Sequence, residues 1–394
     1  MTRKAIIVVA VLVVLGLIGA GIYFMQQPPA PQQAQPPSPA PQQPAAPPPF
    51  VPPSGLQGAV VVALNARGDM NLTAANKALS GEGIIADKQG RLYTADRITT
   101  GEIYMIDPKN PKLVAVAKVP RMQNTPARGD PQMVIPSLLG LAFDKAGNLY
   151  IASSGLSGQD PQRPVGFIFR VPANKLDPAN PGEAQVWATG VPGANGIAFD
   201  SKGNLYVSGR STIYMVPPAG GEGKVLQTRV NGTNGIAFSK DETILWSANN
   251  QNGTIYRIEI NPDGTVKGFT EWLKDPKLLG IDGIQLDTAG NIWGVANRRN
   301  ALVAITPDKK IIDVAVNDNK GPLEFPASMV FVGKTIYIAN TDGANGANSP
   351  RQPGVGPSIA KVEVGIEGLP LPPGTARIQD YALKRSVSNP FLLV

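Results

Sequence analysis

Short apolar runs alternate with turns rich in Gly, Pro, Asn and Asp along most of this chain, and the pattern recurs six times. In each copy an apolar run leads into a turn and then into a second run rich in Ile, Leu, Val, Tyr and Ala. Such runs predict β-strands joined as hairpins. The six copies begin at Glu82, Leu139, Asn195, Asn234, Asp282 and Ala327.

The copies start about 40 to 57 residues apart, a spacing that suits one four-stranded propeller blade each. A third apolar run follows in most copies, at 102–107, 166–171, 212–216 and 254–260. The pattern therefore predicts an all-β, six-bladed β-propeller that occupies residues 54–394 and includes a C-terminal tail. The segment "GAVVVALNARGDM" (58–70) is expected to give the last blade its outer strand and so close the ring.

Four of the turns share the spacing D-x-x-G. Asp at the first position can accept a hydrogen bond from the backbone two residues on, and Gly at the fourth can adopt a positive φ. We therefore predict that these aspartates form turns and are not ligands. The pairs are Asp87/Gly90, Asp144/Gly147, Asp200/Gly203 and Asp287/Gly290.

Two segments of different character precede the repeats. Residues 5–24 form an apolar run of about 20 residues after "MTRK", long enough to cross a bilayer, so residues 1–25 are predicted to be a membrane anchor. A cleaved signal peptide is the alternative. Residues 26–53 are rich in Pro and predict an extended stalk. The propeller would then lie outside the cytoplasm, on the periplasmic or extracellular face.

Two absences from the composition narrow the chemistry. The chain has no Cys and no His, which excludes thiolate nucleophiles, disulfides, His general bases and imidazole metal ligands. Any metal must be held by oxygen, which favours a hard cation such as Ca²⁺ or Mg²⁺. The net charge is +7, but the basic residues are scattered, so nucleic-acid binding is not expected.

The first position of each copy is where polar side chains enter the pattern. Inner strands of a propeller line its central channel, so these positions should meet at one mouth of the channel. Two of them are apolar, whereas four carry oxygen and are each followed by Gly: Glu82, Asn195, Asn234 and Asp282. Turn signals before a strand would explain a single copy. Four at one register predict a polar ring, in which a divalent cation would balance two carboxylates.

The long loops are expected at the same face as this ring. They span 118–137, 153–166 and 340–358, and could form walls or lids around the mouth. Single arginines such as Arg97, Arg210 and Arg298 could reach an anionic substrate there, although a solvated surface position is the expectation for each.

From about Gly81 to Ala339 the chain resembles the SMP-30/gluconolactonase (LRE-like) family of six-bladed propellers. The most specific stretches are "TNGIAFSKDETILWSANNQNGTIYRIEINPDG" (233–264) and "IDGIQLDTAGNIWGVAN". The resemblance implies that Glu82, Asn234 and Asp282 hold a divalent cation, often Ca²⁺. It also implies that Asn195 lies beside the metal and the substrate.

The resemblance further implies hydrolysis of a small lactone or related ester. A cation would polarise the carbonyl, and Asp282 could take the proton from the attacking water because no His is available. Gly193 stands where members that act on sugar lactones commonly carry Arg, which argues against a hydroxylated sugar acid. The alternative is a non-catalytic propeller that binds a ligand or partner at the same mouth, with a structural cation.

Overall fold

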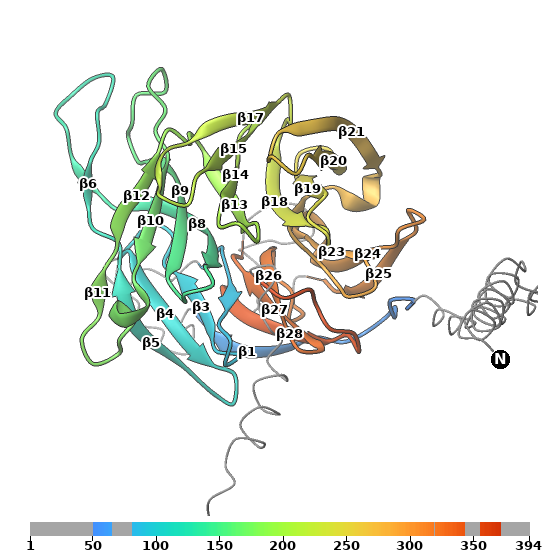
Figure 1. The fold of residues 1–394 in the computed structure, drawn as a ribbon. Helices are drawn as coiled ribbons and strands as arrows, with labels where there is room; N and C mark the ends of the chain where they lie inside the picture. Colours follow the sequence, from blue (N-terminus) through green and yellow to red (C-terminus); the bar gives the residue numbers. More distant parts are fainter. Residues whose placement is uncertain (1–49, 65–80, 319, 343–354, 372–394) are drawn as a thin grey trace, which may run out of the picture. The chain divides into compact units, whose positions relative to one another are not determined.

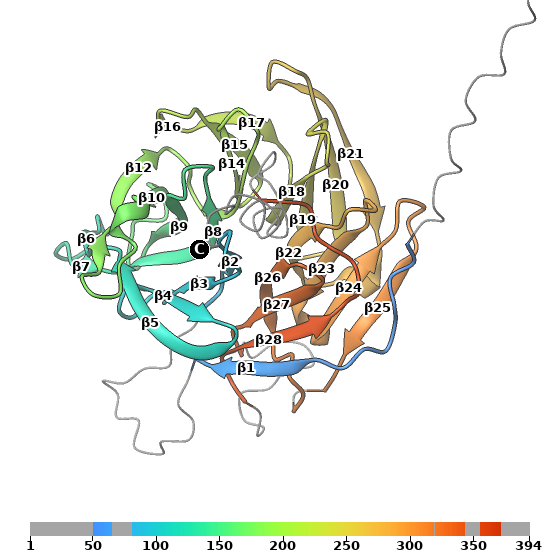
Figure 2. The same ribbon diagram turned by 60° about the horizontal axis from the view of Figure 1, so that its bottom comes forward.

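Six antiparallel sheets stand side by side around a common axis in the computed structural model, each with its first strand innermost (Figures 1 and 2). The structure describes residues 50–64, 81–318, 320–342 and 355–371. The predicted membrane anchor, most of the stalk and the end of the tail lie outside these ranges. None of the helices within them is long and apolar enough to cross a membrane. The predicted all-β, six-bladed propeller is confirmed.

Each blade has four main strands, here given from the channel outward. They are β2 (Ile85–Ala86), β3 (Leu92–Ala95), β4 (Glu102–Asp107) and β5 (Asn110–Lys118); β8 (Pro136–Phe143), β9 (Leu149–Leu156), β10 (Phe167–Val171) and β12 (Gln185–Thr189); β13 (Ala194–Phe199), β14 (Leu205–Gly209), β15 (Thr212–Val216) and β17 (Lys224–Thr228); β18 (Thr233–Phe238), β19 (Ile244–Asn249), β20 (Thr254–Ile260) and β21 (Val266–Lys274); β22 (Ile281–Leu286), β23 (Ile292–Ala296), β24 (Ala301–Ile305) and β25 (Ile311–Val316); and β26 (Pro326–Val332), β27 (Thr335–Asn340), β28 (Ser358–Glu363) and β1 (Ala59–Ala63).

Short elements complete the described chain. Two edge strands run parallel to outer strands, β11 (Gly182–Glu183) beside β5 and β16 (Gly221–Glu222) beside β12. The connection between the first two blades holds a small ribbon of β6 (Met122–Gln123) and β7 (Met133–Val134). Three 3-10 turns are η1 (Ala173–Lys175), η2 (Pro276–Leu278) and η3 (Asn297–Arg299).

The ring is closed by the N-terminal strand, as the sequence predicted. β1 pairs antiparallel with β28, so the last blade is built from both ends of the propeller (Figures 1 and 2). Without β1 the backbone of β28 would be an open sheet edge. This pairing therefore joins the first and last blades through backbone hydrogen bonds.

Aromatic contacts between neighbouring blades repeat around one side of the ring. The second strand of one blade presents a Tyr, and the first strand of the next blade presents a Phe, with the rings edge to face. The pairs are Tyr93–Phe143, Tyr150–Phe199 and Tyr206–Phe238, with centroids 5.1, 4.9 and 4.8 Å apart. Each such pair contributes about 1 kcal/mol beyond its buried area. The repeated aromatic residues of the sequence thus pack one blade against the next.

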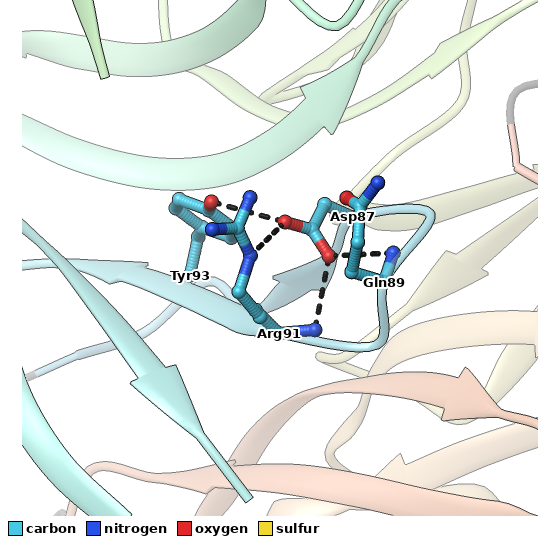
Figure 3. Close-up of polar contacts among 4 residues, drawn as sticks. All are labelled: Asp87, Gln89, Arg91 and Tyr93. Atoms are coloured by element: carbon cyan, nitrogen blue, oxygen red, sulfur yellow. Dashed lines mark hydrogen bonds and ion pairs between the residues drawn. The ribbon is translucent and has the colours of Figure 1, made fainter. Parts of the chain in front are cut away.

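The D-x-x-G turns lie at the end of the channel opposite the polar ring, and the structure confirms their role. In each turn one carboxylate oxygen accepts backbone N–H groups, and the Gly has a positive φ of 78° to 89°. Figure 3 shows the first turn, where Asp87 accepts the backbone N–H groups of Gln89 and Arg91, the Arg91 Nε and the Tyr93 hydroxyl. These carboxylates are satisfied by their own hairpins.

The same end of the channel is covered by the last described segment. The N–H of Leu369 donates to the carbonyl of Leu286, and Gly368 forms a bridge with Asp287. Leu369, Pro370 and Leu371 line the cavity that runs along the channel. The polar ring therefore lies at the other end of the channel, which the last described segment does not cover.

Candidate functional site

The ring positions share one backbone feature, a β-bulge. At the ring position of all six blades, the inner strand has one residue more than the second strand that pairs with it. In the third blade, for example, the extra residue lies between Ala194, which pairs with Gly209, and Ile197, which pairs with Val207. A bulge leaves one residue unpaired and re-aims its side chain. Asn195, Asn234 and Asp282 thus lie within the inner strands β13, β18 and β22, and not in turns before them, whereas Glu82 precedes β2.

The glycines that follow the ring positions allow the inner strands to approach one another. A Cβ at Gly196 or Gly235 would lie less than 3.0 Å from the backbone carbonyl oxygen of the next blade's ring residue, Asn234 or Asp282. Gly83 and Gly140 meet the next blade in the same way. Leu139 is therefore also followed by Gly, although it is apolar. These glycines are required by the narrow centre of the propeller.

The four predicted site residues line a single cavity. Glu82, Asn195, Asn234 and Asp282 all border a space of about 320 Å³ that the inner strands enclose. Below the ring the walls are apolar, with Phe143, Phe199 and Phe238 among the lining residues. The structure thus brings together every residue that the sequence singled out, at the polar end of an otherwise apolar channel.

Glu82 is held beside a cation. Its Oε2 lies 3.2 Å from the Nε of Arg97, and its side chain is 13% exposed. Burial raises the pKa of Glu82 above its ordinary value, and the neighbouring Arg97 guanidinium opposes this shift. Arg97 follows the second strand of the same blade, so the expectation of a purely solvated arginine is wrong at this position.

Asp282 is the more deeply buried carboxylate, at 5% exposure. Burial raises its pKa well above the ordinary value, and the nearby Glu82 raises it further, whereas a hydrogen bond from Asn297 opposes the shift. The Nδ2 of Asn297 donates to Asp282 Oδ2 over 2.9 Å. Two carboxylates therefore repel each other in a low-dielectric site and share one partly compensating arginine.

Asn234 is also buried, at 5% exposure, and its side-chain amide forms no hydrogen bond with any residue that the structure describes. A buried amide without a partner costs free energy unless a ligand or water satisfies it. Asn195 is half-buried at the same end of the cavity. A polar amide is tolerated in this otherwise apolar strand because the bulge turns the residue out of the sheet.

This donor set fits a hard divalent cation. Two mutually repelling carboxylates and an unsatisfied amide supply oxygen atoms and negative charge, the ligands that Ca²⁺ prefers. Within the described ranges, no group of three or more His, Cys, Asp or Glu side chains is placed to hold a metal. A metal at the ring would therefore depend on the Asn234 amide as well as on Glu82 and Asp282.

Sequence reasoning missed Asn297, which positions Asp282. A signal was available in the repeats, because the second strand ends in Ala followed by Asp or Asn in four copies: Asp96, Asn249, Asn297 and Asn340. The other three bond to nearby loops, as when Asn249 Oδ1 accepts the N–H of Gln251. Only the structure distinguishes Asn297 as the member that reaches the ring.

The fold and the polar ring define a class, the six-bladed propellers with an oxygen-donor site at one mouth of the channel. Comparison with known proteins shows a match to a family model: the SMP-30/Gluconolactonase/LRE-like region matches residues 206–341, which confirms the predicted resemblance. This range includes Asn234 and Asp282 but not Glu82 or Asn195. No curated protein matches the chain in sequence.

Solved structures similar to this chain share its fold. A calcium-binding protein, regucalcin, from Agrobacterium tumefaciens is 15% identical with a TM-score of 0.55, over 83% of this chain and all (100%) of that one. A luciferin-regenerating enzyme is 13% identical with a TM-score of 0.53, over 76% and 96% of the two chains. The PQQ-bound aldose sugar dehydrogenase from Streptomyces coelicolor is 17% identical with a TM-score of 0.53, over 80% and 100%. One architecture thus carries different chemistries.

Proposed function

We propose that this chain is a divalent-cation-dependent hydrolase of a small lactone or related ester, which an N-terminal anchor holds outside the cytoplasm. The observation that carries the proposal is the pair of buried carboxylates, Glu82 and Asp282, beside the unpartnered amide of Asn234 at the open end of the channel. The match to the SMP-30/Gluconolactonase/LRE-like region supports a lactonase-type propeller.

Glu82, Asn234 and Asp282 would hold the cation, and Ca²⁺ fits this site because the donors are all oxygen. A cation bound there supplies positive charge that polarises the substrate carbonyl and stabilises the developing oxyanion. The residues themselves set the rest of the chemistry. Arg97 lowers the cost of burying Glu82, and Asn297 fixes the orientation of the Asp282 carboxylate.

Asp282 is also the candidate general base. Its Oδ2 is occupied by Asn297, while its Oδ1 accepts no hydrogen bond from the described residues. Oδ1 could take a proton from a water that attacks the carbonyl carbon. Asn195 would donate to the substrate and orient it.

The test is hydrolysis of a panel of lactones and aryl esters by the full-length protein, with Ca²⁺, with excess chelator, and with Ca²⁺ restored. Activity should vanish with the chelator and return with Ca²⁺. A matched control is Glu363→Gln, since Glu363 lies on β28, has an exposed side chain and pairs with Lys361. No hydrolysis by any preparation, with chelation still lowering the melting temperature, would favour the ligand-binding propeller instead.

A further inference from the structure

A second cavity opens beside the polar ring, and its walls come from the long loops of the first three blades. It has a volume of about 620 Å³. Two of the three loops that the sequence placed at this face, 118–137 and 153–166, contribute to it; the third lies largely outside the described residues. We call this cavity the side chamber. Its lining includes Arg121, Val134, Leu156, Pro164, Val165 and Arg210.

The side chamber lies against the part of the ring that is apolar. Thr99 lines it two residues beyond Arg97, the partner of Glu82, and Ser137 lines it two residues before Leu139. On the other flank, Arg210 follows β14, the strand that pairs with the Asn195 strand. The residues that line the chamber are therefore close in sequence to Arg97, to Leu139 and to the strand that pairs with the Asn195 strand. A molecule held at the ring could extend into it.

Arg210 is the notable charge in this lining. A Cβ at Gly193 would lie 2.7 Å from the Cγ of Arg210, so the absence of a side chain at Gly193 makes room for the arginine stem. Arg210 itself has a positive φ of 23°, a strained value for a residue with a side chain. Gly193 lies two residues before Asn195, and this contact places the stem of Arg210 near the ring.

Arg210 is exposed, and its guanidinium has no partner among the described residues. Its side chain forms neither an ion pair nor a hydrogen bond with any described residue. The other charges of the lining are engaged: Arg121 donates to the Met133 carbonyl over 3.0 Å, and Asp160 accepts the N–H of Gln162. The lining carries apolar side chains, such as Val134, Leu156 and Val165, as well as polar ones, such as Ser137 and Gln159. An unpaired guanidinium beside the apolar part of this lining is complementary to a carboxylate that carries an apolar chain.

We propose that the side chamber binds the apolar part of the substrate, and that Arg210 pairs with a carboxylate on it. This assignment rests on the proposed function. It narrows the substrate class to a lactone or ester that carries a short apolar chain and a carboxylate.

Binding tests the chamber without any need for turnover. The full-length protein would be titrated calorimetrically with hexanoate and with its neutral counterpart hexanamide. Hexanoate should bind about tenfold more tightly or better, since a guanidinium–carboxylate pair is lost with the amide. Arg210→Gln should remove this preference, whereas Arg128→Gln should keep it, because Arg128 lies in the 118–137 loop but outside the chamber lining.

The second variant fills the chamber with a larger side chain. Val165→Trp should weaken hexanoate binding at least about tenfold while acetate binding is unchanged, because only the longer chain needs the space. Equal affinity for hexanoate and hexanamide in the wild type, or an unchanged preference in Arg210→Gln, would overturn the proposal. Hydrolysis is measured separately: Arg210-dependent binding without hydrolysis of any ester would refute the proposed function and the substrate assignment, but not the binding site.

Discussion

Asp282 and Asp287 belong to the same hairpin, five residues apart, and both are buried, yet their surroundings differ. Asp287 accepts four hydrogen bonds from its own hairpin, from the backbone of Ala289, from the backbone and side chain of Asn291, and from the Trp293 indole. Asp282 accepts one, from Asn297, and faces a second carboxylate. The hydrogen bonds around Asp287 satisfy its carboxylate, whereas the carboxylate of Asp282 remains available to a ligand.

The comparison extends around the propeller. At the covered end the turn aspartates are anchored by their own turns, whereas at the open end the ring side chains are turned to the axis by bulges. Residue type alone does not assign a role to a carboxylate; its hydrogen-bond partners do. Four predictions test this distinction, from the largest expected effect to the smallest.

Asp282→Asn should reduce hydrolysis about 10³-fold, which is about 4 kcal/mol of lost transition-state stabilisation. The change removes a ligand charge and the candidate base but keeps the shape of the side chain. At neutral pH the chelated variant should be more stable than the chelated wild type, because a repelling buried carboxylate is gone. Steady-state kinetics and thermal melts check both parts; a variant with wild-type kcat/KM would contradict the assignment.

Asp287→Ala should instead destabilise the fold, by about 3–5 kcal/mol, because it leaves four buried donors without an acceptor. Urea unfolding measures this loss. Asp87→Ala is the matched control, since the first turn is partly exposed and its donors can reach water, so a smaller loss is expected there. Equal losses at the two turns would show that burial does not set the cost.

Gly235→Ala should cost about 2–4 kcal/mol, because the new Cβ would overlap the Asp282 carbonyl across the blade interface. Gly235 has no positive φ, so the loss would report the close approach and not backbone strain. Gly290→Ala is the reverse case. Gly290 has a φ of 87°, but open space would surround a new Cβ, so we expect a loss of about 1 kcal/mol in the free energy of unfolding. Urea unfolding of both variants compares the two effects.

The contribution of Glu82 and Asp282 to the stability of the chelated protein should fall as the pH rises from about 4. The pKa values of Glu82 and Asp282 are both raised in the folded state, so above the ordinary carboxyl pKa of about 4 the folded chain holds more protons than the unfolded chain. Unfolding is then favoured by rising pH until the raised pKa values are passed. Asp282→Asn should flatten this dependence, and a slope that persists in the variant would place its origin elsewhere.

The sequence predicted the architecture well because its repeats are local. The strands expected at 102–107, 212–216 and 254–260 have those bounds, and the D-x-x-G turns and the closing strand are confirmed. These features depend on residues close in sequence, or on the six-fold repeat, which fixes the register of each blade.

The remaining features depend on contacts between blades, which no local pattern encodes. The glycine after each ring residue has the appearance of a turn signal but is required by the carbonyl of the next blade. Arg97 and Asn297 reach the ring only because the fold brings their strand ends to the mouth. The unpaired Arg210 likewise gains meaning only beside Gly193 and the loops of the side chamber.

The most direct test of the central claim is a calorimetric titration of the chelator-treated, full-length protein with Ca²⁺, compared with the same titration of Asp282→Asn and Asp287→Asn. The wild type and Asp287→Asn should bind one Ca²⁺ per chain, while Asp282→Asn should show binding that is at least tenfold weaker, because only the ring carboxylates are free to coordinate. Ca²⁺ binding that is equal in all three proteins, or absent from the wild type, would contradict a cation site at the ring.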